Sequence, residues 1–375
     1  MSLLDSNDQQ KSEHEARFDI YLPRRGADVF LWKETRSRFP AYFDVNGSMI
    51  DTELTIWGGK GHYLSRTTRR SFAVQSNGAM LLRRCSGNRQ VSDRIILHSL
   101  WEDKRKLGYM TSIRLLRKLG LWHAASCLVE LRVATESDKH PGSFDKPVSA
   151  GMYLAVENPA DALRSALALG RSAIVGVHKR INVVSFDTFE ESPELTEAFE
   201  KVLKARTPEE LGALIDLPVY FKWIAFNALT KNRDFWDELI LAFKPNSSQL
   251  SLHAWDYENV FQSCSHGFPT KTYPTNDMVH CPSSPVVRFL YYYPGLKTEY
   301  MKQLRIVLDH VTEAAFINAV NQTMQDIQVV AEYALDLKPQ DRCDFETHKI
   351  TQWMLRQFRP QRRKLAAAVE RELGT

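Results

Sequence analysis

Short runs of hydrophobic and polar positions alternate along the first 160 residues, as β-strands require. Turn residues separate these runs, which cover residues 18–22, 41–45, 52–57, 71–75, 94–98, 127–134 and 151–156. Asn46-Gly47 stands after the second run and predicts a tight hairpin turn. Between residues 104 and 121 apolar side chains recur every three residues, which is a helical spacing. This half is therefore predicted to be a twisted antiparallel sheet carrying one helix.

The second half is predicted to be mostly helical, with helices over 193–205, 208–215 and 218–230 and several more between 286 and 373. Two strand-like runs interrupt it, Leu239–Phe243 and Leu250–Ala254, and the Pro/Asn/Ser turn between them predicts a hairpin. Asn158-Pro159 breaks the strand pattern and is taken as the boundary between lobes. The predicted organisation is a disordered lead-in over 1–17, a sheet-rich lobe over 18–157, and a helical lobe with the hairpin over 158–375. The predicted fold class is α+β.

A carboxylate lies just outside each end of the hairpin. Asp234 precedes its first strand, and Asp256 follows its second. Because a hairpin brings its outer ends together, both side chains are expected to face one cleft. Two close carboxylates repel each other unless a cation lies between them, so the pair predicts a metal-bound phosphate site. A competing interpretation makes Asp234 the N-cap of the segment that follows it.

Composition and charge exclude several classes of protein. The chain has 375 residues, of which 43% are hydrophobic, enough to bury the cores of two lobes. With 49 basic and 45 acidic residues, it carries no nucleic-acid footprint. It has no apolar run long enough for a membrane span, and its polar N-terminus lacks the core of a signal peptide. The five cysteines are odd in number and widely spaced, which predicts reduced thiols and a cytoplasmic protein. The spacing of Cys264, His266, His280 and Cys281 matches no common zinc finger.

Several short motifs occur in a fixed order between Phe18 and Asp326. They are Ile56-Trp57-Gly58-Gly59, Arg69-Arg70-Ser71-Phe72, Trp101-Glu102-Asp103 before the helix, Val129-Glu130-Leu131, Gly151 to Glu157, Asn232-Arg233-Asp234, Trp255-Asp256-Tyr257 and Val287-Arg288-Phe289-Leu290. In this order they resemble the CotH-type spore-coat protein kinase family. The resemblance implies a two-lobed atypical protein-kinase-like fold, with an antiparallel-sheet N-lobe and a mostly helical C-lobe.

The resemblance also implies roles for residues. Asp234 is the predicted catalytic residue, with Asn232 shaping its loop, and Asp256 is the predicted magnesium ligand, with Glu258 as a second acid. The implied cofactors are ATP and Mg²⁺, and the implied acceptor is a Ser or Thr hydroxyl of a protein. The predicted nucleotide contacts are Gly58, Gly59, Lys60, Arg69, Arg70 and Glu157.

The chain departs from the family pattern at three places. Where the family has an asparagine as a second metal ligand, this sequence has acids, so that role passes to Asp237 or Glu238 or is lost. Arg69-Arg70 replaces a lysine pair, and arginine does not copy the compact charge of lysine. On the helix after Asp103 the family has an Arg-Asn pair, but this sequence has Gly108 and Tyr109 near those positions.

Three functions remain open at this point. The first is a Mg²⁺- and ATP-dependent protein Ser/Thr kinase. The second is a transferase on the same fold that moves AMP, or that phosphorylates a small molecule or glycan. The third is a nucleotide-binding pseudokinase that acts as a scaffold. Neither a nucleic acid nor a membrane is an expected partner, and the sequence does not indicate an oligomeric state.

Overall fold

The computed structural model describes residues 17–24, 38–45, 48–57, 70–76, 93–100, 103, 106–179, 182–188, 190–233, 239–262, 264, 278–282, 284–288, 290, 292–331 and 347–374. The predicted lead-in lies outside these ranges except for Arg17. By their contacts the residues form two compact units. The first unit comprises Met1–Lys104, Ala124–Ala162 and Met324–Glu346, and the second comprises Arg105–His123, Leu163–Thr323 and Thr347–Thr375. The units are interleaved in sequence, and the lobe boundary at residue 158 stays a prediction.

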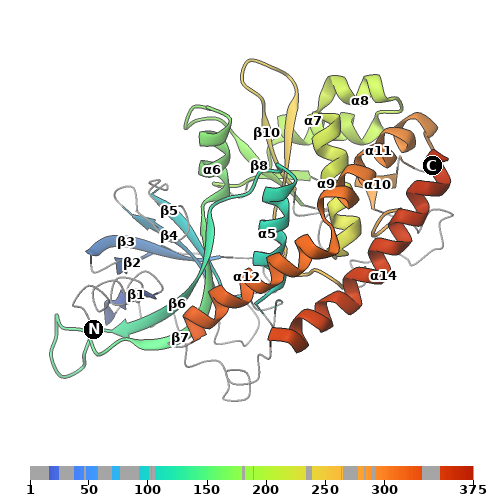
Figure 1. The fold of residues 1–375 in the computed structure, drawn as a ribbon. Helices are drawn as coiled ribbons and strands as arrows, with labels where there is room; N and C mark the ends of the chain where they lie inside the picture. The colour runs from blue at the N-terminus through green and yellow to red at the C-terminus, as the bar shows by residue number, and fades with distance from the viewer. Residues whose placement is uncertain are drawn as a thin grey trace. The chain divides into compact units, whose positions relative to one another are not determined.

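The first unit is built on a closed barrel of seven strands in the order β1-β2-β3-β4-β5-β7-β6 (Figure 1). Their bounds are β1 Arg17–Leu22, β2 Phe39–Val45, β3 Ser48–Trp57, β4 Ser71–Ser76, β5 Arg94–His98, β6 Ser126–Thr135 and β7 Val148–Glu157. β1 pairs with β6 in parallel, with Phe18 opposite Leu131, whereas the other neighbours are antiparallel. The prediction of an antiparallel sheet was therefore wrong at this pair. Closure through the parallel pair removes both free sheet edges.

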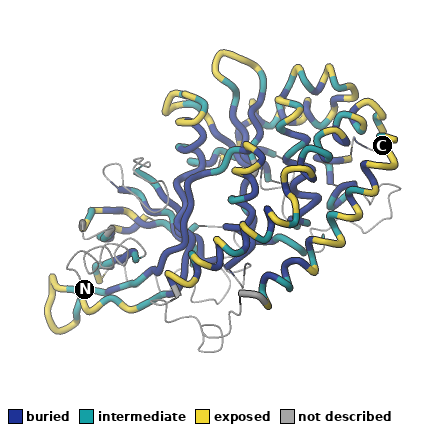
Figure 2. The backbone as a smooth tube through the Cα atoms, viewed as in Figure 1, coloured by how far each residue is buried: buried dark blue, intermediate teal, exposed yellow. Residues whose placement is uncertain are grey.

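Alternating side chains of these strands fill the barrel, as the sequence pattern predicts. Phe18 and Phe43 meet edge to face with ring centroids 5.3 Å apart, and Phe72 stacks on Tyr153. The apolar cluster continues through strands β3 to β5 and β6. In Figure 2 the colour of buried residues prevails along β6 and β7, whereas β2 to β4 alternate between buried and more exposed positions. The interior of the barrel is therefore a packed apolar core.

The sheet of the second unit has four strands in the order β11-β10-β8-β9. β10 (Leu239–Phe243) and β11 (Leu250–Ala254) form the predicted hairpin, with Leu239 opposite Ala254, and this prediction is confirmed. β8 (Val175–Lys179) and β9 (Asn182–Ser185) were not predicted. β8 pairs antiparallel with β10, so it covers the inner edge of the hairpin and fixes the hairpin within a sheet.

The helices within the described residues are α5 Gly108–Lys118, α6 Pro159–Ala166, α7 Pro193–Lys204, α8 Pro208–Leu214, α9 Leu217–Thr230, α10 Pro285–Arg288, α11 Pro294–His310, α12 Glu313–Ala331 and α14 Thr347–Leu373. Helix α5 groups with the second unit, although it was expected to pack on the sheet of the first half. No helix within the described ranges combines the length and apolarity needed to cross a bilayer. Helices and sheets together confirm the predicted α+β class.

Helix α6 begins where the sequence indicated a break. The Asn158 side-chain oxygen accepts hydrogen bonds from the backbone N–H groups of Ala160 and Asp161, at 3.0 and 3.3 Å. Asparagine is a favoured N-cap, and proline is favoured at the first helical position. Asn158-Pro159 therefore starts a helix directly after β7 ends at Glu157.

Candidate functional site

The segment that carries Asn232 begins at the end of helix α9. Most of its side chains are buried, and it ends at Lys231, which adopts a left-handed conformation with φ +50°. The Lys231 N–H donates to the carbonyl of Asn227, which closes the last turn. The chain then reverses direction and places Asn232 in a fully buried position. Asn232, which stands just before the predicted catalytic residue Asp234, is thus anchored by a buried helix.

Asn232 joins the two ends of the hairpin. Its side-chain Nδ2 donates a hydrogen bond of 3.0 Å to the backbone carbonyl of Asp256. Beside it, Arg233 N donates to Asn259 O at 3.0 Å, and Phe261 N donates to Thr230 O at 2.7 Å. The segment that leads to Asp234 therefore runs along the segment that follows β11. The predicted site residues Asp234, Asp237 and Glu238 themselves lie outside the described residues.

Asp256 has an uncommon backbone conformation. Its φ is +47°, in the left-handed region, where aspartate is tolerated better than most residues. Its Oδ1 accepts a hydrogen bond of 3.0 Å from the backbone N–H of Glu258, two residues further on. This is the local turn that aspartate side chains favour. The carboxylate is therefore held in one orientation by its own backbone.

Aromatic rings enclose the residues on both sides of Asp256. Tyr109 of α5 meets Trp255 and Tyr257 edge to face, each with ring centroids 6.4 Å apart. Phe186 packs against Trp255 at 6.0 Å, and Phe226 of α9 against Tyr257 at 5.6 Å. We call these five residues the aromatic clamp. Sequence reasoning missed Tyr109 as a part of the site, although it had marked the position as a departure from the family pattern.

The comparisons with known proteins bear on the same elements. A family model described as CotH kinase protein matches residues 178–364, a range that includes α9, the hairpin and Asp256. Residues 178–364 belong to the CotH kinase family. The predicted resemblance is confirmed over this range, and it supports a kinase-type phosphotransferase. No protein among the curated sequences matches the chain significantly.

One solved structure with similarity to this chain is a complex from Shewanella oneidensis MR-1 of the toxin–antitoxin proteins HipA and HipB with operator DNA. Its sequence identity is 16% and its TM-score 0.32, and the alignment covers 75% of this chain and 58% of that chain. The similarity therefore spans less than two thirds of the other protein. At this TM-score it carries no argument about fold or function.

Asp256 fits the way in which proteins bind magnesium. Mg²⁺ is usually held by one or two carboxylates together with phosphate oxygens of the substrate, rather than by a cage of side chains. The described part of the chain holds no cluster of three or more histidine, cysteine, aspartate or glutamate side chains suited to a metal. Glu258 is largely buried beside Asp256, and its role as a second acid stays a prediction.

The described nucleotide candidates lie in the first unit. Arg70 is half-buried and directly precedes β4. Glu157 is the last residue of β7, where it is buried and its N–H donates to the carbonyl of Ala125 at 2.9 Å. The remaining candidates, Gly58, Gly59, Lys60 and Arg69, lie outside the described residues. All six assignments stay predictions.

A disulfide flanks the segment that follows Asp256. Cys264 and Cys281 are bonded, with their Cα atoms 5.4 Å apart, and Cys127 is also disulfide-bonded. The prediction of reduced thiols was therefore wrong. It rested on the wide spacing of the cysteines, but loops bring together residues that are far apart in sequence. Because disulfides persist in oxidising surroundings, cysteine usage no longer supports a cytoplasmic location.

Two histidines near the site are kept neutral. Burial, and secondarily the charge of Lys244, lowers the pKa of His253 to about 3. Burial and the charge of Lys231 lower the pKa of His280 to about 4. In β11, His253 Nε2 lies 2.6 Å from the Ser251 hydroxyl, and its ring packs against Trp122. Neither imidazole carries charge near neutral pH.

Proposed function

We propose that this chain is a Mg²⁺- and ATP-dependent phosphotransferase with a two-lobed kinase-like fold, whose acceptor is a Ser or Thr hydroxyl of a protein. The observation that carries the proposal is the bond from Asn232 Nδ2 to the Asp256 carbonyl. It joins the segment leading to Asp234 with the segment that bears Asp256. The family match over residues 178–364 supports the same reaction class.

Each residue has a separate role in this proposal. Asp256 holds the metal, and bound Mg²⁺ neutralises charge on the phosphates during transfer. Asp234 orients the acceptor hydroxyl and accepts its proton as the oxygen attacks the γ-phosphorus and the bond to the bridging oxygen of ADP breaks. Arg69 and Arg70, with the Gly58–Lys60 turn and Glu157, bind the nucleotide.

One observation favours a pseudokinase as the second candidate. At Tyr109 the family resemblance leads one to expect a polar Arg-Asn pair nearby, but the side chain here is 1% exposed and its ring meets Trp255 and Tyr257 edge to face. The sequence thus lacks the expected Arg-Asn pair on this helix. A protein that binds nucleotide without transferring phosphate would tolerate such a replacement.

The test is incubation of the purified chain with Mg²⁺ and ATP labelled on either the α- or the γ-phosphate, followed by mass spectrometry of the chain and of added proteins. We expect label from the γ position only. Label from the α position would establish AMP transfer instead. Asp234→Asn should lower turnover by about two orders of magnitude or more with little change in ATP affinity. Nucleotide binding without any label in protein would favour the pseudokinase.

A further inference from the structure

The Cys264–Cys281 disulfide lies beside Arg233, the residue directly before Asp234 in the sequence. Cys264 follows β11, and Cys281 precedes α10. The Cys281 sulfur is 4.0 Å from the carbonyl oxygen of Arg233. Because a bonded sulfur carries no hydrogen, this contact is one of packing rather than a hydrogen bond. The disulfide is therefore in contact with the backbone that leads to the predicted catalytic residue.

The two segments that the disulfide joins are each fixed to a different helix. Shortly before Cys264, the Phe261 N–H donates to the carbonyl of Thr230, the last residue of α9, at 2.7 Å. Shortly before the second cysteine, the carbonyl of Met278 accepts a hydrogen bond of 2.6 Å from the buried hydroxyl of Tyr300 in α11. The disulfide thus connects a segment bonded to α9 with a segment bonded to α11.

The backbone of Arg233 is held from both of these segments. Its N–H donates to the carbonyl of Asn259, on the segment that ends in Cys264, at 3.0 Å. Its carbonyl packs against Cys281 on the other segment. The Cα atoms of the two cysteines are 5.4 Å apart, and they do not separate beyond about 7 Å while the bond persists. The bond therefore limits how far the two sides of Arg233 can move apart.

We propose that the Cys264–Cys281 disulfide positions the Arg233 backbone for phosphate transfer, and that reduction by a dithiol releases it and lowers turnover. The effect on turnover rests on the proposed function, in which Asp234 orients the acceptor hydroxyl. The release of Arg233 does not depend on that function. The disulfide is then a redox-sensitive positioning device next to the site rather than only a stabilising crosslink.

The reduction step follows from the exposure of the two sulfurs. Cys264 is half-buried and Cys281 is 1% exposed, so a dithiol attacks the Cys264 sulfur. The S–S bond breaks, and its electron pair leaves with the Cys281 sulfur, which takes up a proton. The second thiol of the reductant then displaces the Cys264 sulfur, which is also protonated. Both cysteines end as thiols, and the dithiol is oxidised to a disulfide.

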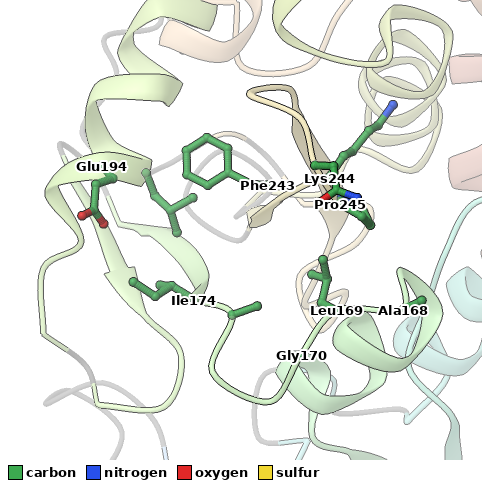
Figure 3. A pocket seen from close by; sticks show the side chains of 11 residues that line it. Ala168, Leu169, Gly170, Ile174, Glu194, Phe243, Lys244 and Pro245 are labelled. Carbon is green, nitrogen blue, oxygen red and sulfur yellow. The ribbon is translucent and has the colours of Figure 1, made fainter.

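A cavity in the same unit supplies an internal reference for the test. Its volume is about 580 Å³, and the loop after α6, the start of α7 and the turn after β10 line it (Figure 3). On one wall, Leu169 N donates to Arg164 O at 2.8 Å. On another, Lys244 N donates to Gln249 O at 2.9 Å. None of the described residues that line the cavity belongs to the segments that the disulfide joins, so reduction should not change the exchange of these two N–H groups.

The test compares amide hydrogen exchange of the full chain before and after reduction with dithiothreitol, with the freed thiols alkylated and counted by mass spectrometry. We expect the Arg233 N–H to exchange about tenfold faster after reduction, while the Leu169 and Lys244 N–H groups keep their rates. The double variant Cys264→Ser, Cys281→Ser should exchange as the reduced wild type does and should not respond to dithiothreitol.

Cys127→Ala is the matched control, because it removes the disulfide of another buried cysteine that belongs to the first unit. Its Arg233 N–H should respond to dithiothreitol as that of the wild type does. Loss of the response in this variant overturns the proposal, and so does an Arg233 rate that reduction leaves unchanged. Equal acceleration at Arg233 and at the two cavity N–H groups also overturns it, since this indicates a general loss of stability.

Activity gives the second readout. In an active protein, reduction should lower kcat by about tenfold or more and change KM for ATP by less than about twofold, because orientation of the acceptor hydroxyl acts in the transition state. Reoxidation with oxidised glutathione should restore kcat. An active protein with the same kcat in both states overturns the proposal. Faster exchange at Arg233 in a protein that transfers no phosphate in either state refutes the proposed function and leaves the positioning of Arg233 in place.

Discussion

Replacement of Tyr109 by leucine tests whether the aromatic clamp holds Asp256 in place. Leucine keeps most of the apolar volume of this buried position but loses both edge-to-face contacts, with Trp255 and Tyr257. Such contacts contribute about 0.5–1.5 kcal/mol each beyond the burial of area, so the free energy of unfolding should fall by about 1–3 kcal/mol. Tyr109→Phe keeps both ring contacts and removes only the hydroxyl, so its difference from Tyr109→Leu isolates the contribution of the ring.

The effect on the site is separate from the effect on stability. A left-handed conformation costs a residue other than glycine about 1–2 kcal/mol, and Asp256 is held there by its surroundings. If loss of the clamp lets Asp256 relax, the fraction of molecules able to bind falls, and the apparent Kd for Mg²⁺-nucleotide rises by about 5–30-fold. Phe199→Leu is the matched control, because Phe199 is a buried ring of the same unit that packs on His178 rather than on the Asp256 segment.

Isothermal titration with ATP at several Mg²⁺ concentrations measures the affinity, and urea denaturation measures the stability. The reasoning is refuted if Tyr109→Leu and Phe199→Leu lose similar stability and Tyr109→Leu binds Mg²⁺-nucleotide as tightly as wild type. Amide hydrogen exchange gives a readout that does not depend on nucleotide. The Glu258 N–H, which donates to Asp256 Oδ1, should exchange faster in Tyr109→Leu and at the wild-type rate in Phe199→Leu.

Three further predictions concern the same unit. Asp256→Asn keeps a side-chain oxygen that can accept the Glu258 N–H, and asparagine also tolerates the left-handed conformation. The free energy of unfolding in urea should therefore change by less than about 0.5 kcal/mol, while titration should show that Mg²⁺-dependent ATP binding is lost. Histidine in the unfolded chain has a pKa near 6.5, whereas burial lowers the pKa of folded His253 to about 3 and that of folded His280 to about 4. Below pH 6.5 the unfolded chain therefore binds more protons than the folded one, and the free energy of unfolding should fall as the pH falls. The substitution of both by glutamine should flatten that dependence. Cys264→Ser opens a loop whose ends are 17 residues apart in sequence and should lower stability by about 3 kcal/mol, a difference that dithiothreitol removes.

Local patterns predicted the elements that carry the site. β10 and β11 were predicted with their observed bounds, because their apolar runs are short and a turn of proline, asparagine and serine lies between them. From the hairpin alone it followed that the segments outside it approach each other, and the bond from Asn232 to the Asp256 carbonyl joins them. β8 and β9 were missed because Val175–Lys179 and Asn182–Ser185 are only five and four residues long, too short for a periodic signal.

What the sequence could not indicate depends on contacts between residues far apart in the chain. The left-handed conformation of Asp256 has no local signal, since aspartate adopts several conformations and no glycine marks the position. The residues around it come from distant parts of the chain: Asn232, 24 residues earlier, donates to its carbonyl, and Tyr109 on a separate helix contacts the neighbouring Tyr257. The same holds for the Cys264–Cys281 bond and for the parallel pairing of β1 with β6. A family pattern marks the aspartate, but Tyr109 contacts only the residues on either side of it in the contacts described above, and therefore Tyr109 is the position at which substitution best separates positioning of the carboxylate from its chemistry.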